Sequence, residues 1–210
     1  MERPAIVAIS GFTSEVGKTT LLCELLRALP GWEAIKMTRG HYRSCGKDPH
    51  SCCVSHLLSD EPVIRSGRDS TYAAGKDTGR YWDAGASNVH WVIVTDSQVE
   101  QGIDQVLKRV SAPGVLIEGN SFLDFVHADL VFMVANATDE KIKSSARRAL
   151  SHATLIYLTG GGDTVESRSL KTSTLWQTNS LIAKLTDSLP IYTKADLSNL
   201  IMQVRGINEG

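Results

Sequence analysis

Neither sign of charge is in excess in this chain. Its 210 residues carry 22 Lys and Arg against 23 Asp and Glu, a formal net charge of −1. That balance excludes a general electrostatic attraction to nucleic acid or to an anionic membrane. No apolar run approaches the roughly 20 residues that cross a bilayer, and residues 1–4 lack the charged-then-apolar pattern that begins a signal peptide. We therefore expect a cytoplasmic protein without nucleic-acid or membrane partners.

Cysteine is scarce, with four in the chain, and three of them lie with three of the six histidines in residues 41–56. Cysteines of a cytoplasmic protein are usually thiols or metal ligands rather than disulfides. Thiolates and imidazoles suit Zn²⁺, although the spacing matches no standard zinc finger. The segment is either a zinc site or a substrate loop with incidental thiols. The candidate zinc ligands are Cys45, His50, Cys52, Cys53 and His56.

The most informative segment is GFTSEVGKTT at residues 11–20, which follows the apolar run 5–9 and precedes LLCELL at 21–26. A strand, a glycine-rich turn, a lysine, a hydroxyl and a helix together are typical of a phosphate-binding loop. Its backbone N–H groups and the helix N-terminus attract an anion. Lys18 would contact the β- and γ-phosphates, and Thr19 would bind Mg²⁺. The expected nucleotide contacts are Thr13, Ser14, Glu15, Val16, Gly17, Lys18, Thr19 and Thr20.

This loop is one residue longer than the usual pattern, because five residues rather than four separate Gly11 from Gly17. The stretch Thr13–Thr19 resembles the loop of dethiobiotin synthetases, which reads Gly-x-Asp-Thr-x-Val-Gly-Lys-Thr/Ser. That resemblance covers the loop alone. It implies ATP-dependent synthetase chemistry as one reading of the site.

Apolar strands and helices alternate along the chain, which favours a mostly parallel sheet with helices on both faces. We expect one nucleotide-binding domain over 1–210, a P-loop NTPase three-layer sandwich, with an irregular Cys/His-rich insertion at about 40–70. Candidate functional segments follow the strands, so they should share one edge of the sheet. The predicted strands are 5–10, 33–38, 89–95, 115–117, 130–135, 154–158 and 190–192. The predicted helices are 19–28, 77–84, 98–110, 140–150, 175–185 and 195–204.

A second resemblance rests on GKDTGRYWDAGA at residues 75–86. It matches the Gly-Lys-Asp-Ser/Thr-x-Arg-x-x-x-Ala-Gly-Ala pattern of the molybdopterin-guanine dinucleotide biosynthesis protein B family. Leu-Ile-Glu-Gly at 116–119 is similar to that family's Val-Glu-Gly, and Leu-Pro-Ile-Tyr at 189–192 to its closing strand. The chain departs from the family at Met37, where a histidine is common, and at Asn120, near which many members have a lysine. These departures indicate a relative with its own substrate.

This resemblance implies a phosphate-loop nucleotidase of the SIMIBI class, whose members often form homodimers. The named family binds GTP and assists attachment of a nucleotide to molybdopterin. By the same resemblance, Asp77 and Glu118 would lie near Mg²⁺ and the phosphates, with Lys18 and Thr19. Lys18, Glu118 and Asp77 are therefore the expected catalytic residues.

Two further sites remain open on the sequence alone. Asp96 is either a second acidic Mg²⁺ ligand or the cap of the following helix. Asn136 and Asp139 stand where guanine-specific GTPases have Asn-Lys-x-Asp; alternatively, Thr138 or Asp139 only caps the helix expected to begin near Glu140. The base, ATP or GTP, thus stays undecided. His90, inside an apolar strand, is expected to be a hydrogen-bonded core histidine.

The leading hypothesis is a Mg²⁺-dependent P-loop NTPase, either an NTP hydrolase or a nucleotide-dependent transferase or ligase. It would assist cofactor biosynthesis, with a small-molecule or cofactor substrate and a second copy of the chain as partners. The alternatives are a synthetase of dethiobiotin-synthetase type and a nucleotide-switched metal-binding protein or metallochaperone that uses the Cys/His cluster.

Overall fold

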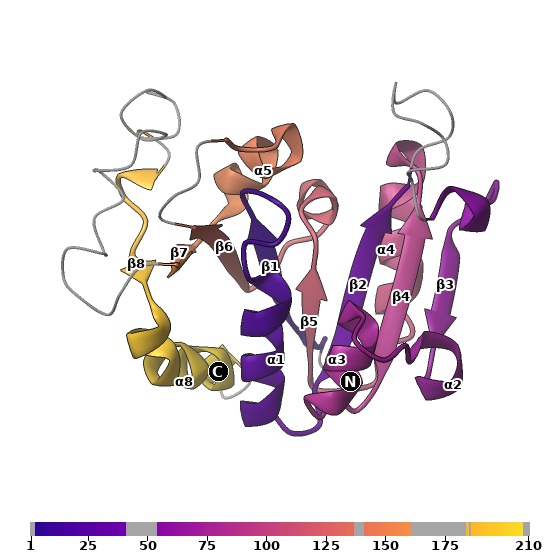
Figure 1. The fold of residues 1–210 in the computed structure, drawn as a ribbon, viewed down its shortest axis with the longest axis horizontal. Coiled ribbons are helices and arrows are strands. Elements are labelled where there is room, and N and C mark those ends of the chain that lie inside the picture. The colour runs from indigo at the N-terminus through magenta and orange to yellow at the C-terminus, as the bar shows by residue number, and fades with distance from the viewer. Residues whose placement is uncertain (1–2, 41–53, 137–140, 161–183, 185, 208–210) are drawn as a thin grey trace.

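The computed structural model describes residues 3–40, 54–136, 141–160, 184 and 186–207. One eight-stranded sheet runs through this part of the chain, in the order β3-β4-β2-β5-β1-β6-β7-β8 (Figure 1). All neighbouring strands are parallel except β3, which runs antiparallel to β4 at one edge. The strands are β1 (Ala5–Gly11), β2 (Glu33–Arg39), β3 (Val63–Ser66), β4 (Val89–Val94), β5 (Gly114–Glu118), β6 (Leu130–Asn136), β7 (Leu155–Thr159) and β8 (Ile191–Tyr192).

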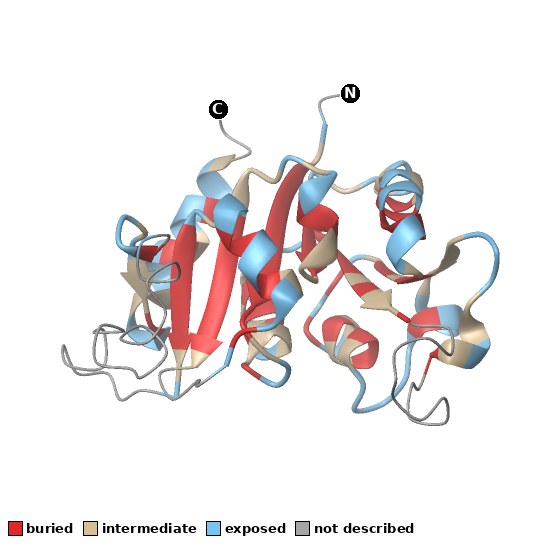
Figure 2. Cartoon of the chain, turned by 90° about the horizontal axis from the view of Figure 1, so that it is seen from above, coloured by how far each residue is buried: buried red, intermediate tan, exposed pale blue. Residues whose placement is uncertain are grey.

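Helices cover both faces of the sheet. One core packs the sheet against α1 (Lys18–Ala28), α3 (Asp77–Asp83) and α8 (Leu197–Gly206). The other packs it against α4 (Val99–Leu107) and α5 (Ser144–Ala149), while α2 (Arg68–Thr71) lies beside β3 and β4. Figure 2 shows the buried strands between the two helical layers. Short 3₁₀ turns occupy Ser55–Leu57, Asp96–Gln98, Ser121–Asp124, Leu150–His152 and Lys194–Asp196.

Burial follows directly from the apolar patterning. Every residue of β1 is buried, as expected for a central parallel strand that is covered on both faces. In α4, Val99, Ile103 and Val106 recur at helical spacing and are all buried. The predicted α/β architecture, a mostly parallel sheet with helices on both faces, is confirmed.

Strand β3 was not predicted, because it lies in the polar stretch expected to be irregular. Its four residues are all half-buried at the sheet edge, so they lack the continuous apolar pattern of the inner strands. The helix predicted over 140–150 begins only at Ser144. The predicted helix at 175–185 falls almost wholly outside the described residues. Among the described helices, none combines the length and apolar character needed to cross a membrane.

Candidate functional site

The loop between β1 and α1 has a backbone that only particular residues adopt. Gly17 has φ of 101°, and a Cβ at this position would lie 3.1 Å from Thr159 Cγ2. The positive φ favours glycine there, and a larger residue would also press against Thr159. Glu15 has φ of 61°, which is uncommon for a residue with a side chain and often marks a functional loop.

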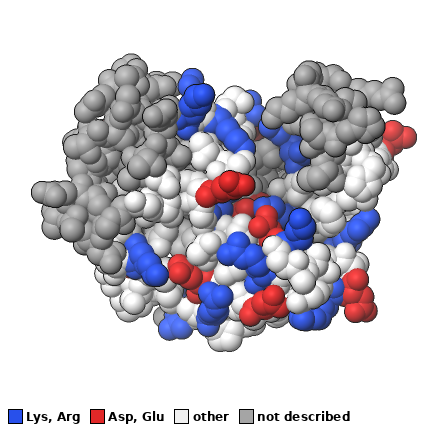
Figure 3. All heavy atoms as spheres, in the orientation of Figure 1, with Lys and Arg blue, Asp and Glu red and all other residues white. Residues whose placement is uncertain are grey.

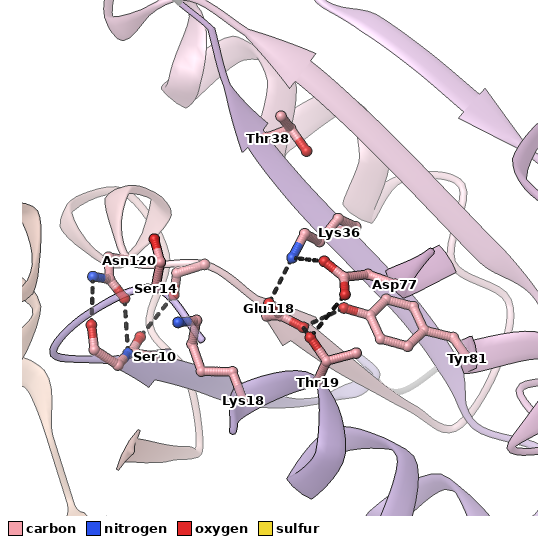
Figure 4. A network of polar contacts seen from close by, with 12 residues as sticks. Ser10, Ser14, Lys18, Thr19, Lys36, Thr38, Asp77, Tyr81, Glu118 and Asn120 are labelled. Atoms are coloured by element: carbon pink, nitrogen blue, oxygen red, sulfur yellow. Dashed lines mark hydrogen bonds and ion pairs between the residues drawn. The ribbon is translucent and has the colours of Figure 1, made fainter. Parts of the chain in front are cut away.

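Side chains from two other strands brace this loop. The Asn120 side chain, just after β5, accepts a hydrogen bond from the Gly11 amide and donates one to the Gly11 carbonyl, both at 3.0 Å (Figure 4). On the other side, Thr159 Oγ1 at the end of β7 lies 2.9 Å from the Val16 carbonyl oxygen. Lys18 Nζ donates to the Thr13 carbonyl at 2.7 Å across the loop itself. The loop is therefore held in shape by the sheet that surrounds it.

Three oxygen-bearing side chains meet at the start of α1. Thr19 Oγ1 lies 3.0 Å from Asp77 Oδ1 and 2.9 Å from Glu118 Oε2. Lys36 Nζ, from β2, lies 2.5 Å from the other oxygen of each carboxylate. The buried Tyr81 hydroxyl also donates to Glu118 (Figure 4). The start of α1, helix α3, the middle of β2 and the end of β5 thus contribute to one polar cluster.

The hydroxyl of Thr19 cannot satisfy both carboxylates. It carries a single proton, so only one of its two short contacts is a hydrogen bond. In the other contact, the Thr19 oxygen and a carboxylate oxygen lie within 3.0 Å of each other with no proton between them. Lys36 offsets the two negative charges, and hydroxyl and carboxylate oxygens are the ligands that Mg²⁺ prefers in proteins. Thr19, Asp77 and Glu118 therefore suit a magnesium ion.

Charge and burial perturb the ionisable groups of this cluster. Burial by itself lowers the pKa of Lys36, but Glu118 and Asp77 outweigh it and raise that pKa above its usual value. Burial lowers the pKa of Lys18, and Glu118 only partly opposes this effect. The pKa of Asp77 is lowered, because Lys36 outweighs the effect of its burial. Burial beside Glu118 raises the pKa of Tyr81 well above its usual value. Such shifts concentrate at functional sites.

These residues line a cleft of about 780 Å³ at the carboxyl ends of β1, β2 and β5. Ligands commonly bind at this edge of a parallel sheet. Charged side chains of both signs gather around a hollow near the middle of the face in Figure 3. The five basic residues of the lining exceed its three acidic ones, although the whole chain has a net charge of −1. The basic residues are Lys18, Lys36, Arg39, Arg80 and Lys143, and the acidic ones are Glu15, Asp77 and Glu118. The cleft favours an anionic ligand.

Most of the site residues expected from the sequence come together here. The predicted loop residues that line the cleft, with Asp77 and Glu118, are Thr13, Ser14, Glu15, Gly17, Lys18, Thr19 and Thr20. Val16, in the same loop, is buried and does not line the cleft. The structure thus assembles the loop and both carboxylates in one place.

Asp96 and Asn136 are not among the residues that line the cleft, although Arg39, the partner of Asp96, is one of them. Asp96 pairs with Arg39 at 3.1 Å, and the capping box before α4 uses Thr95 and Gln98 instead of Asp96. Asn136 ends β6 and packs against Gly160, where a Cβ would lie 2.6 Å from its Oδ1. The predicted roles of these residues in magnesium and base binding remain predictions.

The candidate zinc ligands Cys45, His50, Cys52 and Cys53 lie outside the described residues, as does Asp139. His56 is exposed in the 3₁₀ turn Ser55–Leu57. Within the described residues there is no cluster of three or more His, Cys, Asp or Glu side chains that could hold a metal. The zinc hypothesis therefore stays a prediction for residues 41–56.

Sequence reasoning overlooked Lys36, Tyr81, Asn120 and Lys143. Lys36 carried a weak signal, since it is a charged residue between the apolar Ile35 and Met37 of β2. Tyr81 lies within the 75–86 motif and Asn120 lies shortly after a predicted strand, whereas Lys143 carried no signal. His90 is buried, as expected, and its ring nitrogens lie 2.7 Å from Ser66 Oγ and from Glu33 Oε2.

Comparison with known proteins adds no assignment. No protein-family model and no curated protein sequence matches this chain. The function must therefore be argued from the cleft itself.

Proposed function

We propose that this chain is a P-loop NTPase that binds a magnesium–nucleoside triphosphate in the cleft between the 11–20 loop, β2 and β5. The observation that carries the proposal is that the carboxylates of Asp77 and Glu118 both contact the Thr19 hydroxyl, which has one proton. This trio lies at the N-terminal turn of α1, beside the Lys18 ammonium group. A triphosphate needs both a cationic cradle and a metal, and Lys18 lines the same cleft as the three residues that would hold the metal.

Each residue has a distinct part in this proposal. The loop amides and Lys18 bind the β- and γ-phosphates. Thr19 would hold Mg²⁺, with Glu118 and Asp77 beside it, and the ion would neutralise phosphate charge and orient the phosphates. Lys36 bridges the two carboxylates. It fixes them in position, so that they need no reorganisation when the nucleotide binds.

The reaction that fits best is nucleotide-dependent assistance of cofactor biosynthesis, in the manner of the molybdopterin-guanine dinucleotide biosynthesis protein B family. The supporting observation is that the segment most similar to that family supplies the site. Asp77 contacts Thr19, Arg80 donates to Thr20 at 3.1 Å, and Tyr81 contacts Glu118. Synthetase chemistry of the dethiobiotin-synthetase type is the second candidate, supported by the loop. Turnover with small substrates would favour the synthetase, and turnover only with a partner protein would favour assistance.

Isothermal titration calorimetry with Mg-ATP and Mg-GTP tests nucleotide binding. Lys18→Ala should weaken binding by roughly 100-fold, because a charged hydrogen bond contributes up to about 3 kcal/mol. Lys108→Ala is the matched control: Lys108 directly follows α4, is exposed, and pairs with Asp104. Wild-type protein that binds neither nucleotide, or Lys18→Ala protein with unchanged affinity, would refute the proposal.

A further inference from the structure

Lys143 lies on the other side of the phosphate loop from Lys36. The sheet order places β1 between β5 and β6, and Lys143 is the residue from which α5 begins, after β6. Its backbone amide donates to the Phe12 carbonyl at 3.0 Å, and its Nζ donates to Ser14 Oγ at 2.5 Å. Both contacts are with the first half of the loop, so Lys143 is fixed to it by main chain and side chain.

The contacts of Lys143 locate it at the phosphate end of the cleft. Phe12 and Ser14 flank Thr13, whose carbonyl lies 2.7 Å from Lys18 Nζ. The lysine of a phosphate loop reaches the β- and γ-phosphates. Lys143 therefore lies beside the part of the loop where the end of a triphosphate would be.

A lysine is an unfavourable choice for local structure at this position. Lys143 is the N-cap of α5 and makes no side-chain cap hydrogen bond. Ser, Thr, Asp or Asn there would stabilise the helix by about 1 kcal/mol, and a positive charge opposes the helix dipole. Helix formation therefore does not explain this lysine.

The charges around Lys143 indicate a role in binding an anion. Lys36 and Lys143 both act on Lys18 as repelling charges. Lys36 is neutralised by Asp77 and Glu118, whereas within the described residues the ammonium group of Lys143 contacts the neutral Ser14 hydroxyl. Its side chain is exposed in the cleft lining, where it is free to contact an anion.

We propose that Lys143 contacts the terminal phosphate of the bound nucleotide and thereby distinguishes triphosphates from diphosphates. This inference rests on the proposed nucleotide binding. An oxygen of the terminal phosphate replaces the Ser14 hydroxyl as the partner of Nζ, and a charged partner makes the stronger hydrogen bond. A diphosphate has no group at that place, so Lys143 contributes nothing to its binding. The Lys143 ammonium group belongs to the same chain as the loop and lies on the side of the loop away from Asp77 and Glu118.

The test compares affinities for Mg²⁺ complexes of ADP, GDP and the non-hydrolysable β,γ-imido analogues of ATP and GTP, measured by calorimetry. Lys143→Ala and Lys143→Met should each weaken analogue binding by about tenfold and change diphosphate affinity less than twofold. Lys143→Arg keeps the charge and should retain most of the preference. Lys141→Ala removes an exposed lysine from the same segment and is the matched control.

Each outcome is decisive for Lys143. Equal loss of both affinities in Lys143→Ala would mean that the residue only shapes the loop, and would overturn the inference. An unchanged preference for the triphosphate would also overturn it while leaving the proposed function intact. If wild-type protein binds neither analogue nor diphosphate, both proposals are wrong. Circular dichroism confirms that each variant is folded.

Discussion

Two buried glutamates lie at opposite edges of one pair of parallel strands, and their surroundings differ. Glu33 begins β2, at the edge away from the cleft. Its Oε1 accepts hydrogen bonds from the Ser111 amide at 3.0 Å, the Ser111 hydroxyl at 3.0 Å and the Ala112 amide at 3.1 Å. Its Oε2 lies 2.7 Å from His90 Nε2. Every oxygen of Glu33 is therefore satisfied by groups of the chain itself.

Glu118, at the end of β5, is differently placed. Lys36 and the Tyr81 hydroxyl are its donors, while Thr19 Oγ1 has one proton for two carboxylates, Glu118 and Asp77. The negative charge of Asp77 is thus held close to that of Glu118. The comparison teaches that burial alone does not mark a functional carboxylate. The difference lies in the partners: backbone amides, a hydroxyl and an imidazole at Glu33, and an ammonium, a phenol and a hydroxyl shared with a second carboxylate at Glu118.

The largest effect on stability is expected at Glu33, whose carboxylate oxygens all have hydrogen-bond partners within the chain. Glu33→Ala leaves three donors and the His90 ring without their buried partner, so it should lower the free energy of unfolding by about 3–5 kcal/mol. Urea unfolding followed by circular dichroism measures this loss. Glu100→Ala, on the exposed face of α4, is the control and should change stability by less than about 0.5 kcal/mol. A comparably small loss for Glu33→Ala would contradict the structural role assigned to Glu33.

The same conservative substitution in both carboxylates sharpens the comparison further. Glu118→Gln should weaken the Mg²⁺-dependent part of nucleotide affinity by about 10- to 100-fold, as loss of groups around a metal does. Glu33→Gln should leave that affinity unchanged. Calorimetry with Mg²⁺ and with excess chelator separates the two contributions. If both variants lose Mg²⁺ dependence alike, the distinction between the two sites is wrong.

The smallest expected difference concerns pH. Burial raises the pKa of Glu33, but hydrogen bonds from His90 and Ser111 outweigh it, so the net pKa lies below its usual value. A carboxylate with a lowered folded-state pKa contributes stability above about pH 4.3, its unfolded value, and loses it as the pH falls through the folded value. The wild type should therefore lose stability more steeply on acidification than Glu33→Gln. Parallel curves of unfolding free energy against pH would contradict this prediction.

The central strands and helices could be predicted from the sequence because each one has a local pattern of apolar residues. Strand β1 and helix α1 follow from a buried apolar run, a glycine turn and leucines at helical spacing. Strand β3 could not be predicted in the same way. Its identity depends on pairing with β4 across the intervening α2 and α3, and its half-buried residues carry no strong period.

The candidate site was predictable only in part for a related reason. Lys18 and Thr19 are identified by the loop in which they stand. Thr19 meets Asp77 from 58 residues away and Glu118 from 99 residues away, and the order of strands in the sheet decides those meetings. The resemblance of the Gly-Lys-Asp segment to a known family suggested them, whereas no local pattern did. Lys143 could not be identified in this way, because only its contacts with Phe12 and Ser14 of the loop place it at the site.

The bracing of the loop by Asn120 and Thr159 has a kinetic consequence. An anion that enters the cleft meets a backbone already shaped by the strands on either side, so no segment of the loop must fold during the encounter. Association then requires diffusion and orientation of the ligand but no ordering of the loop. Differences between ligands would appear chiefly in how long each one stays.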